Sequence, residues 1–444
     1  MLINKIRKNL IAAVIFSLLF VIQNNAQEKR QLTLDESLKI GLENSKTLHS
    51  SRLKIISSEA QLSQANAAGL PSLGIGATYT RLSNVDPYNI TIPGMGSFTV
   101  SPSILDNYTA KVTLQQPLFT GFKISSNYDI AQNNALAVKQ DYSKDEQDVI
   151  YNVKNAYWNL FLAGKLKEAI DENVQQMKAH LEDIQNFFKQ GLATKNEVLK
   201  VEVQLSEAQL SQIDARNSVK IATVNFDNVI NIPLSTEIEI QKEVLVENEN
   251  IEDIDQLIDK AMKNRPDLKS LQYKLNASKN GITLAQSGWF PQVVLAGEYD
   301  YSKPNSRILP VENKFNGTWA INLGLTYNLW DWGTTKAQTT QAESQYEQTK
   351  DSYSTLKDAV TLDVTQNYYN LIKAKEKVLV TQQTVSQAEE NYRVTDDKFR
   401  QGLTLNSELL DAEVALVQAK TNNAQSIADY ELAKAQIERS TGGK

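Results

Sequence analysis

One phrase occurs twice in this chain. Residues 187–199 read FFKQGLATKNEVL and residues 398–410 read KFRQGLTLNSELL, so the second copy begins 211 residues after the first (398 − 187). The segments NVKNAYWNLFLA at 152–163 and DVTQNYYNLIKA at 363–374 have the same offset. Similarity that holds at one offset over a long stretch predicts a fold in which one structural unit is built twice.

Upstream the offset becomes 220, because LPSLGIGATY from Leu70 aligns with FPQVVLAGEY from Phe290. One length difference of nine residues (220 − 211), between residues 79 and 118 of the first copy, explains both offsets. The flanking segments alternate between apolar and polar side chains and so predict four strands, at 72–80, 108–118, 292–301 and 317–330. Each is close to the roughly 9–11 residues that a tilted strand needs to cross a membrane.

Aromatic side chains gather at the ends of the predicted strands. They would form one rim at Trp289, Phe290, Phe119, Trp330 and Trp332, and a second rim at Tyr79, Tyr108, Tyr299 and Tyr301. Such girdles are typical of outer-membrane strands, although a soluble β-sandwich with one wet face is an alternative. Because four strands cannot close a barrel and lipid does not tolerate an open sheet edge, several chains would have to share one barrel.

The rest of the chain predicts long helices. All ten prolines lie outside residues 118–232 and 311–444, and a helix from about residue 123 to 190 shows apolar steps of four and three, as in a coiled coil. We therefore expect a helix, a turn and a returning helix in each copy. Gly191 and Gly402 suit the tight turns, and Thr194 and Asn406 are the expected N-caps of the returning helices.

Composition argues against catalysis. The chain has no cysteine, which excludes a thiolate nucleophile, a disulfide framework and a zinc–thiolate site, and its two histidines, His49 and His180, are expected on helix surfaces. No nucleotide-binding, zinc-protease or serine-hydrolase motif is present. A net charge of −6 disfavours a nucleic-acid partner. The sequence thus predicts a protein without enzymatic activity, cofactor or bound metal.

The N-terminus predicts export. Lys5, Arg7 and Lys8 precede an apolar run at residues 10–22, and a small-residue cleavage site lies near Ala26. No later segment is long and apolar enough for a transmembrane helix, so membrane insertion would require a closed β-barrel.

This order of elements resembles the TolC-type outer-membrane efflux protein family (outer membrane factors) over essentially the whole mature chain. The resemblance rests on the two QGL hairpin segments, on AYWNL and NYYNL, and on the strand entries LPSLG and FPQVV. It implies a signal peptide at 1–26, a first structural repeat at 27–233, an equatorial linker at 234–250 and a second repeat at 251–444.

The resemblance also implies an architecture and a function. Three chains would form a twelve-stranded β-barrel in the cell outer membrane, continued into the periplasm by a barrel of twelve helices. The protein would be a passive exit duct of a tripartite efflux or type I secretion system. Its partners would be a periplasmic adaptor (membrane fusion) protein and, through the adaptor, an inner-membrane pump.

The family's hairpin tips supply candidate adaptor-docking residues. They fall on Gly191, Leu192, Ala193 and Thr194 and on Gly402, Leu403, Thr404 and Leu405. The alternative is that QGL merely turns the chain, which explains the glycines but explains the repeated leucine less well.

The family's pore-narrowing aspartates align with Glu408 and Asp411. Because these residues are three apart they share a helix face, and three chains would bring six carboxylates around the axis. Glu408 departs from the family's aspartate, and the first-half positions, Glu197 and Lys200, are mixed in sign. Ordinary solvated helix charges are the alternative.

Other classes of protein fit the sequence less well. A secreted or periplasmic coiled-coil structural protein explains the helices but not the strands with aromatic ends. A periplasmic adaptor would have a single hairpin rather than two, and no nucleophile and base are recognisable for a hydrolase. In the duct, residues 81–106 and 302–316 would be cell-surface loops.

Overall fold

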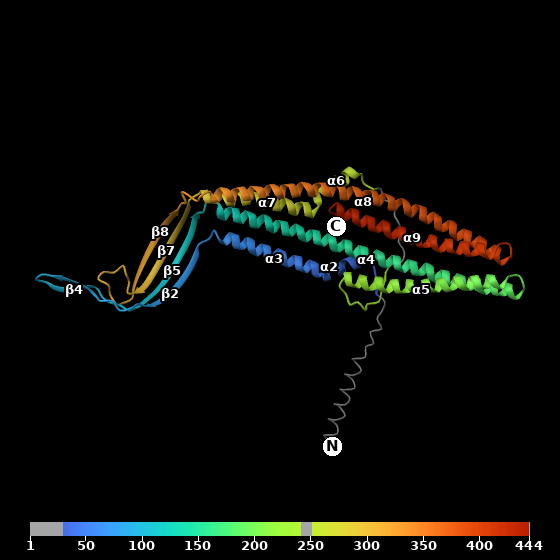
Figure 1. Ribbon diagram of the computed structural model, residues 1–444, viewed down its shortest axis with the longest axis horizontal. Helices are drawn as coiled ribbons and strands as arrows, with labels where there is room; N and C mark the ends of the chain where they lie inside the picture. The colour runs from blue at the N-terminus through green and yellow to red at the C-terminus, as the bar shows by residue number, and fades with distance from the viewer. Residues whose placement is uncertain (1–29, 241–250, 444) are drawn as a thin grey trace, which may run out of the picture. The chain divides into compact units, whose positions relative to one another are not determined.

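The computed structural model describes residues 30–240 and 251–443 and consists mainly of long helices (Figure 1). The helices are α2 (Leu34–Asn44), α3 (Lys46–Ala67), α4 (Lys123–Lys189), α5 (Lys195–Val229), α6 (Ile254–Asn264), α7 (Pro266–Gln286), η1 (Ser287–Trp289), α8 (Thr334–Arg400) and α9 (Asn406–Ser440). The strands are β1 (Arg30–Leu32), β2 (Ser72–Arg81), β3 (Tyr88–Ile92), β4 (Gly96–Ser101), β5 (Asp106–Phe119), β6 (Ile238–Ile240), β7 (Gln292–Lys303) and β8 (Asn316–Thr326). The predicted signal peptide, and the part of the predicted linker at 241–250, lie outside the described residues.

The described residues form two compact units. The first, here called the helical unit, contains the residues up to 49, residues 145–265 and the residues from 360 onwards. The second, here called the strand unit, contains residues 50–144 and 266–359. Each unit takes residues from both halves of the sequence, because the long helices α4 and α8 run from one unit into the other. The two structural repeats predicted at 27–233 and 251–444 divide the chain differently from these two units. Their boundaries stay a prediction.

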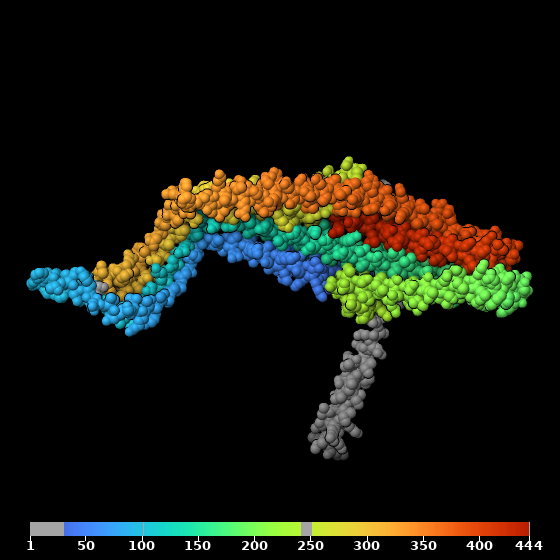
Figure 2. Space-filling view, viewed as in Figure 1, coloured from blue at the N-terminus to red at the C-terminus, as the bar shows by residue number. Residues whose placement is uncertain are grey.

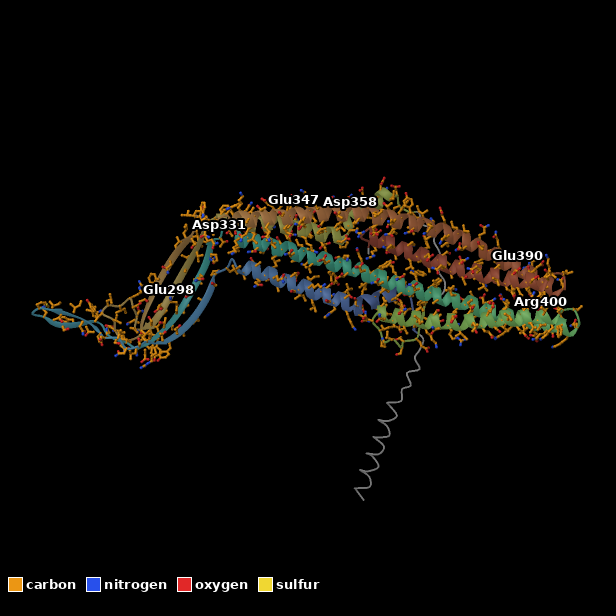
Figure 3. The ribbon with its side chains drawn as sticks, viewed as in Figure 1. Glu298, Asp331, Glu347, Asp358, Glu390 and Arg400 are labelled. Atoms are coloured by element: carbon orange, nitrogen blue, oxygen red, sulfur yellow. The ribbon has the colours of Figure 1, made fainter. Side chains whose placement is uncertain are left out.

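The strand unit contains a four-stranded antiparallel sheet in the order β2-β5-β7-β8. Strand β5 pairs with β7, so the two halves of the sequence meet in the middle of the sheet. In the register, Leu73 lies opposite Leu114, Ile75 opposite Val112 and Leu295 opposite Leu323. One face is therefore apolar across all four strands, as the alternation predicted. The other face is more polar and contains Glu298, which is labelled in Figure 3. Its Oε2 forms an ion pair with Lys111 Nζ, 3.1 Å away.

The four predicted strands are confirmed, with one difference at an end. Strand β8 stops at Thr326, whereas the alternation predicted a strand as far as Trp330. The reason is the partner strand: Gln292, the first residue of β7, lies opposite Thr326, so residues 327–330 have no strand of the sheet beside them. Within residues 81–106, expected to be a surface loop, β3 and β4 form a two-stranded antiparallel hairpin.

Aromatic rings cluster at both ends of the sheet. At one end Tyr108 contacts Tyr79 at 5.0 Å and Phe315 at 6.0 Å between ring centroids, and Tyr301 stacks on Phe315 at 5.2 Å. At the other end three phenylalanine rings pack edge to face, at Phe119, Phe122 and Phe290. The sequence placed most of these residues at the two rims, but Phe122 and Phe315 are additions from the structure.

The helical unit is a layer of four helices in the order α5, α4, α9, α8, which Figure 1 shows as green, teal, red and orange ribbons. Helices α4 and α5 share a small buried cluster around Val174, Met177 and Ala208. Helices α8 and α9 share another around Ala388, Leu416 and Ala419. The two hairpins meet where α4 lies against α9. Helices α5 and α8 are consequently the two margins of the layer.

The largest core cluster of the helical unit joins α4 and α5 to the small elements beside them. Its buried members are Leu32, Val153, Tyr157, Trp158, Leu160, Phe161, Phe226 and Ile230. Strand β1 pairs in parallel with β6, which lies in the described part of the predicted linker at 234–250. Helix α2 approaches this core through a buried glycine, Gly41.

Gly41 allows a close approach that a larger residue would prevent. A Cβ atom at this position would lie 2.7 Å from Val153 Cγ2 and 3.6 Å from Ile230 Cγ2. Alanine normally favours a helix over glycine by about 0.5–1 kcal/mol. We nevertheless expect Gly41→Ala to lower the free energy of unfolding by about 1–2 kcal/mol, because overpacking outweighs that gain. Thermal unfolding of the purified protein in detergent, followed by circular dichroism, measures this.

Two variants control this prediction. Gly164→Ala changes a glycine of α4 whose added Cβ would meet no atom within 4 Å, so it should raise stability instead. In Gly41→Ala with Val153→Ala, the clashing methyl group is gone, so the double variant should be more stable than the sum of the two single changes predicts. A destabilising Gly164→Ala, or strict additivity in the double variant, would contradict the packing argument.

Candidate functional site

The turns of the two helical hairpins have the same backbone geometry. Gly191 has φ +77° and Gly402 has φ +70°, a conformation that glycine adopts without strain. The N–H of Leu192 donates to the carbonyl of Phe187 at 2.9 Å, and the N–H of Leu403 donates to that of Lys398 at 2.8 Å. Both turns are Schellman C-caps, so the predicted tight turns at the two glycines are confirmed.

The leucines that follow these glycines are exposed. Leu192 keeps 74% of its accessible surface, Leu403 keeps 71% and Leu405 keeps 65%. In a Schellman motif the residue after the glycine often packs back against its own helix. Neither Leu192 nor Leu403 is covered in that way, so capping alone does not account for an apolar residue at both tips.

The returning helix α5 begins with a capping box. Glu197 N–H donates to Thr194 Oγ1 at 3.3 Å, and Thr194 N–H donates to Glu197 Oε2 at 2.7 Å. The backbone N–H and the hydroxyl of Thr194 together hold the pKa of the Glu197 carboxyl below its usual value. The predicted N-cap at Thr194 is confirmed. Ala193, beside Thr194, is half-buried against a cluster of buried apolar residues that includes Ile184 and Val198.

The predicted N-cap of α9 is wrong. The N-cap is Leu405, which has no side-chain acceptor, and Asn406 is the first residue of the helix. The offset between the two sequence copies is consistent with an N-cap at Leu405, because Leu405 is the counterpart of the N-cap Thr194 (194 + 211). Thr404, one residue earlier, donates its hydroxyl to the Glu408 carboxylate.

Asn406 instead holds the two hairpins together through a histidine. His180 of α4 is buried, with Nε2 2.7 Å from Asn406 Oδ1 and Nδ1 3.2 Å from Glu413 Oε2. The expectation that His180 lies on a helix surface is therefore wrong, whereas His49 is exposed as expected. The contacts join residues more than 220 positions apart, and no spacing pattern in the sequence could have revealed them.

Further contacts between the hairpins lie close to the tips. The rings of Phe187 and Phe399 are 5.5 Å apart. Arg400, which is labelled in Figure 3, has its Nε 3.7 Å from Asp183 Oδ2. Ile184, Val198, Val201, Phe399 and Leu409 form a buried cluster to which both hairpins contribute. The exposed leucines of the two tips therefore lie next to a packed cluster at this end of the helical unit.

The two candidate pore residues, Glu408 and Asp411, are exposed on α9 within two turns of its start. Glu197, the first-half counterpart of Glu408, is engaged in the capping box. Among the described residues, no group of three or more His, Asp or Glu side chains is arranged to hold a metal ion. No helix in the described part of the chain is both long and apolar enough to cross a membrane.

Comparison with known proteins assigns the chain to a family. A family model described as "Outer membrane efflux protein" matches residues 38–231 and 257–443. The chain belongs to this family. The resemblance inferred from the sequence is confirmed. The predicted location of the protein, in the outer membrane with an extension into the periplasm, is confirmed as well.

Relatives of the outer membrane efflux family include proteins of export systems. The alkaline protease secretion protein AprF of Pseudomonas aeruginosa is 24% identical over 343 residues, which cover 75% of this chain and 69% of AprF. The outer membrane protein TolC of Vibrio cholerae serotype O1 is 23% identical over 344 residues, 77% of this chain and 78% of TolC.

Solved structures show the same fold. The outer-membrane channel OprN matches with a TM-score of 0.76 at 16% identity, covering 93% of this chain and 90% of OprN. The outer membrane protein VceC of Vibrio cholerae matches with a TM-score of 0.78 at 17% identity, covering 92% of this chain and 96% of VceC. The fold of this chain is therefore the TolC-like channel fold.

One buried acid in the helical unit was not anticipated. Asp227 of α5 is fully buried beside Phe226, and neither of its carboxylate oxygens has a hydrogen-bond partner among the described residues. Burial raises the pKa of the Asp227 carboxyl from its ordinary 3.8 to about 6. The charged form of this residue is therefore a source of instability at neutral pH.

Replacement of Asp227 should stabilise the protein in a pH-dependent way. The unfolded carboxyl ionises near pH 4 and the folded one near pH 6, so the native chain loses stability as pH rises through this window. From the value of about 6, the loss above pH 7 is on the order of 3 kcal/mol. We expect Asp227→Asn to unfold at a higher temperature than the native protein at pH 7.5 and at a similar temperature at pH 4. Thermal melts across this range measure it.

Asp214→Asn, at an exposed position of the same helix, is the control and should leave the pH profile unchanged. If Asp227→Asn kept the native pH profile, the stability change would not come from ionisation of this carboxyl.

Proposed function

We propose that this protein is the outer-membrane exit duct of a tripartite export system. It would passively conduct substrates, delivered through a periplasmic adaptor by an inner-membrane pump, to the cell exterior. The observation that carries the proposal is the family match, which spans both halves of the chain. The relatives' names support drug efflux and protein secretion alike, since one is a "Toxin and drug export protein A" and another an alkaline protease secretion protein.

We propose further that three chains close one barrel. The sheet has four strands and two open edges, at β2 and β8, whose backbone groups need partners in a membrane. Three copies would supply twelve strands (3 × 4). The apolar face would meet lipid, and the polar face with the Lys111–Glu298 pair would line the lumen. The six hairpins of three chains would supply the twelve helices of the periplasmic tunnel.

The alternative is a secreted or periplasmic coiled-coil structural protein. It is disfavoured by the sheet, because Trp319, Ile321, Leu323 and Leu325 would then present a continuous apolar face to water. The native mass of the detergent-extracted particle distinguishes the two. A trimer that requires detergent supports the duct, whereas a monomer that stays soluble without detergent would leave the coiled-coil protein as the better account.

The tip leucines carry the proposed adaptor contact, within a site formed by Gly191, Leu192, Ala193 and Thr194 and by Gly402, Leu403, Thr404 and Leu405. We expect Leu192→Ser with Leu403→Ser to reduce export by roughly tenfold or more, because anchors of this kind dominate interface affinity. The measurement is export by cells that lack their own chromosomal copy. Folding should not suffer, because both side chains are exposed.

Leu234→Ser, at an exposed leucine outside the tips, is the matched control and should export normally. Normal export by the double tip variant, at equal abundance in the outer membrane, would remove the leucines from the docking site.

Glu408 and Asp411 are proposed to form an acidic ring at the periplasmic mouth. Three copies would place six carboxylates around the axis (3 × 2), which would favour cations. We expect Glu408→Gln with Asp411→Asn to lower the cation-over-anion permeability ratio in planar bilayers, and the native preference to weaken as salt increases. Glu207→Gln with Asp214→Asn removes the same charge from exposed positions of α5 and should leave selectivity unchanged. Equal effects of the two double variants would argue against a ring.

A further inference from the structure

The apolar face of the sheet carries three charged side chains, and all three lie at the same end. In the register, Arg81 at the end of β2 lies opposite Asp106 at the start of β5, and Lys303 at the end of β7 lies opposite Tyr108. Alternate residues of a strand share a face, so these three charges lie on the apolar face with Tyr108. The end of the sheet that carries them, here called the tyrosine rim, also carries Tyr79, Tyr108, Tyr299 and Tyr301.

Two of these charges neutralise each other, and the third has no ionic partner. Arg81 Nη1 lies 2.7 Å from Asp106 Oδ1. Lys303 forms no ion pair with any residue in the described ranges, and its Nζ lies 5.9 Å from the ring centroids of both Tyr108 and Phe315. Aromatic rings attract a cation but carry no net negative charge. One positive charge per chain is therefore not compensated on the apolar face.

The loop between β7 and β8 holds a second cation against the tyrosine rim; Figure 2 shows this loop in gold, at the end of the sheet away from helix α7. The side-chain amide of the buried Asn305 donates to the Asn316 carbonyl at 3.0 Å, and its Oδ1 accepts from the N–H of Arg307 at 3.0 Å. Arg307 Nη1 donates to the carbonyl of Trp319 at 2.9 Å. Arg307 is exposed and, like Lys303, has no carboxylate partner among the described residues.

Aromatic rings lie beside both cations. Phe315 stacks on Tyr301, with 5.2 Å between ring centroids and 16° between the ring planes. Trp319 lies opposite Tyr299 in the register, and both are exposed on the apolar face. Aromatic girdles of this kind mark the level at which the hydrocarbon of a membrane meets the lipid headgroups. The two cations therefore lie at the depth of the headgroups.

We propose that Lys303 and Arg307 bind the phosphate of a lipid headgroup in the outer leaflet of the outer membrane, with one lipid for each chain. The proposal rests on the proposed duct, in which the tyrosine rim is the outer rim of the barrel. A phosphate supplies the negative charge that the apolar face lacks, and ammonium and guanidinium groups both donate charge-assisted hydrogen bonds to phosphate oxygens. The acyl chains would then follow the exposed apolar side chains of β8, such as Ile321 and Leu323.

The alternative is that the rings of Tyr108 and Phe315 satisfy Lys303 without any ligand. Lysines near a membrane surface commonly extend their ammonium groups toward water in this way. Such a lysine would add no affinity for one headgroup over another. The two accounts therefore differ in whether lipid binding depends on phosphate and on Lys303.

Native mass spectrometry of the detergent-extracted trimer counts the bound lipid directly. The trimer is titrated with diphosphoryl lipid A, and it should bind up to one molecule per chain. Monophosphoryl lipid A, which has the same acyl chains and one phosphate fewer, should bind more weakly. Lys303→Gln should weaken the binding of diphosphoryl lipid A by roughly fivefold, the change expected when one cation near an anionic membrane surface is lost. Lys303→Arg keeps the charge and should bind close to the native level.

Lys314→Gln is the matched control. It removes the same charge from the same loop, but Lys314 is already paired with Glu312 at 2.5 Å, so lipid binding should stay at the native level. Arg307→Gln should weaken binding as Lys303→Gln does. An equal loss in Lys314→Gln and Lys303→Gln would show a general effect of charge and would overturn the site.

Inorganic phosphate distinguishes a lipid from a soluble anion. The trimer is incubated with diphosphoryl lipid A in excess inorganic phosphate, or in sodium chloride of the same ionic strength, before transfer to a volatile buffer. Both salts should leave similar amounts of lipid bound, because free phosphate has no acyl chains to contact the apolar face. Complete displacement by phosphate alone would assign the cations to a soluble anion and overturn the lipid.

The same spectra separate this proposal from the proposed duct. A trimer that binds the two forms of lipid A equally, with no effect of Lys303→Gln, would overturn the lipid site and leave the duct intact. A monomer that stays soluble without detergent would overturn the duct and, with it, the outer rim on which the lipid site rests.

Discussion

A four-stranded sheet with one largely apolar face and two unpaired edges is the constraint on which the rest of this structure depends. The apolar face, from Leu73 on β2 to Leu323 on β8, suits a lipid environment, in which unpaired backbone groups are costly. A single chain cannot meet both demands. In the proposed duct, further copies pair with β2 and β8, and the helices that continue from the strands must then pack around the same axis.

The helical unit shows how a repeated sequence can produce unequal contacts. The hairpins share their turn geometry, at Gly191 and Gly402, and buried core positions such as Val153 and Val364. They differ at the contact between α4 and α9. Lys154 and Glu172 of α4 form ion pairs with Glu438 and Lys420 of α9. The counterparts of Lys154 and Glu172 on α8 are the uncharged Thr365 and Gln383.

The ends of the hairpins combine a packed base with exposed apolar residues at the tips. His180, Asn406 and Glu413 join the hairpins in a buried polar contact, and Phe187 packs against Phe399 nearby. Buried polar groups of this kind require their partners, so they favour one arrangement of the two hairpins. The leucines beyond them are uncovered, as a surface for a transient partner would be. The two hairpin tips of this chain are thus joined by buried contacts close to their turns.

Local patterns in the sequence were enough to identify the four strands, the long helices, the glycine turns and the N-cap at Thr194, because each depends on residues close together in the chain. The end of β8 at Thr326 was not predictable in this way, since it depends on where β7 begins. Likewise Asn406 was expected to cap α9, and His180 to face solvent, because their partners lie on other helices. Burial of Asp227 and the order α5, α4, α9, α8 follow from long-range packing. Periodicity records which face of an element is apolar, and only the tertiary structure decides what covers that face.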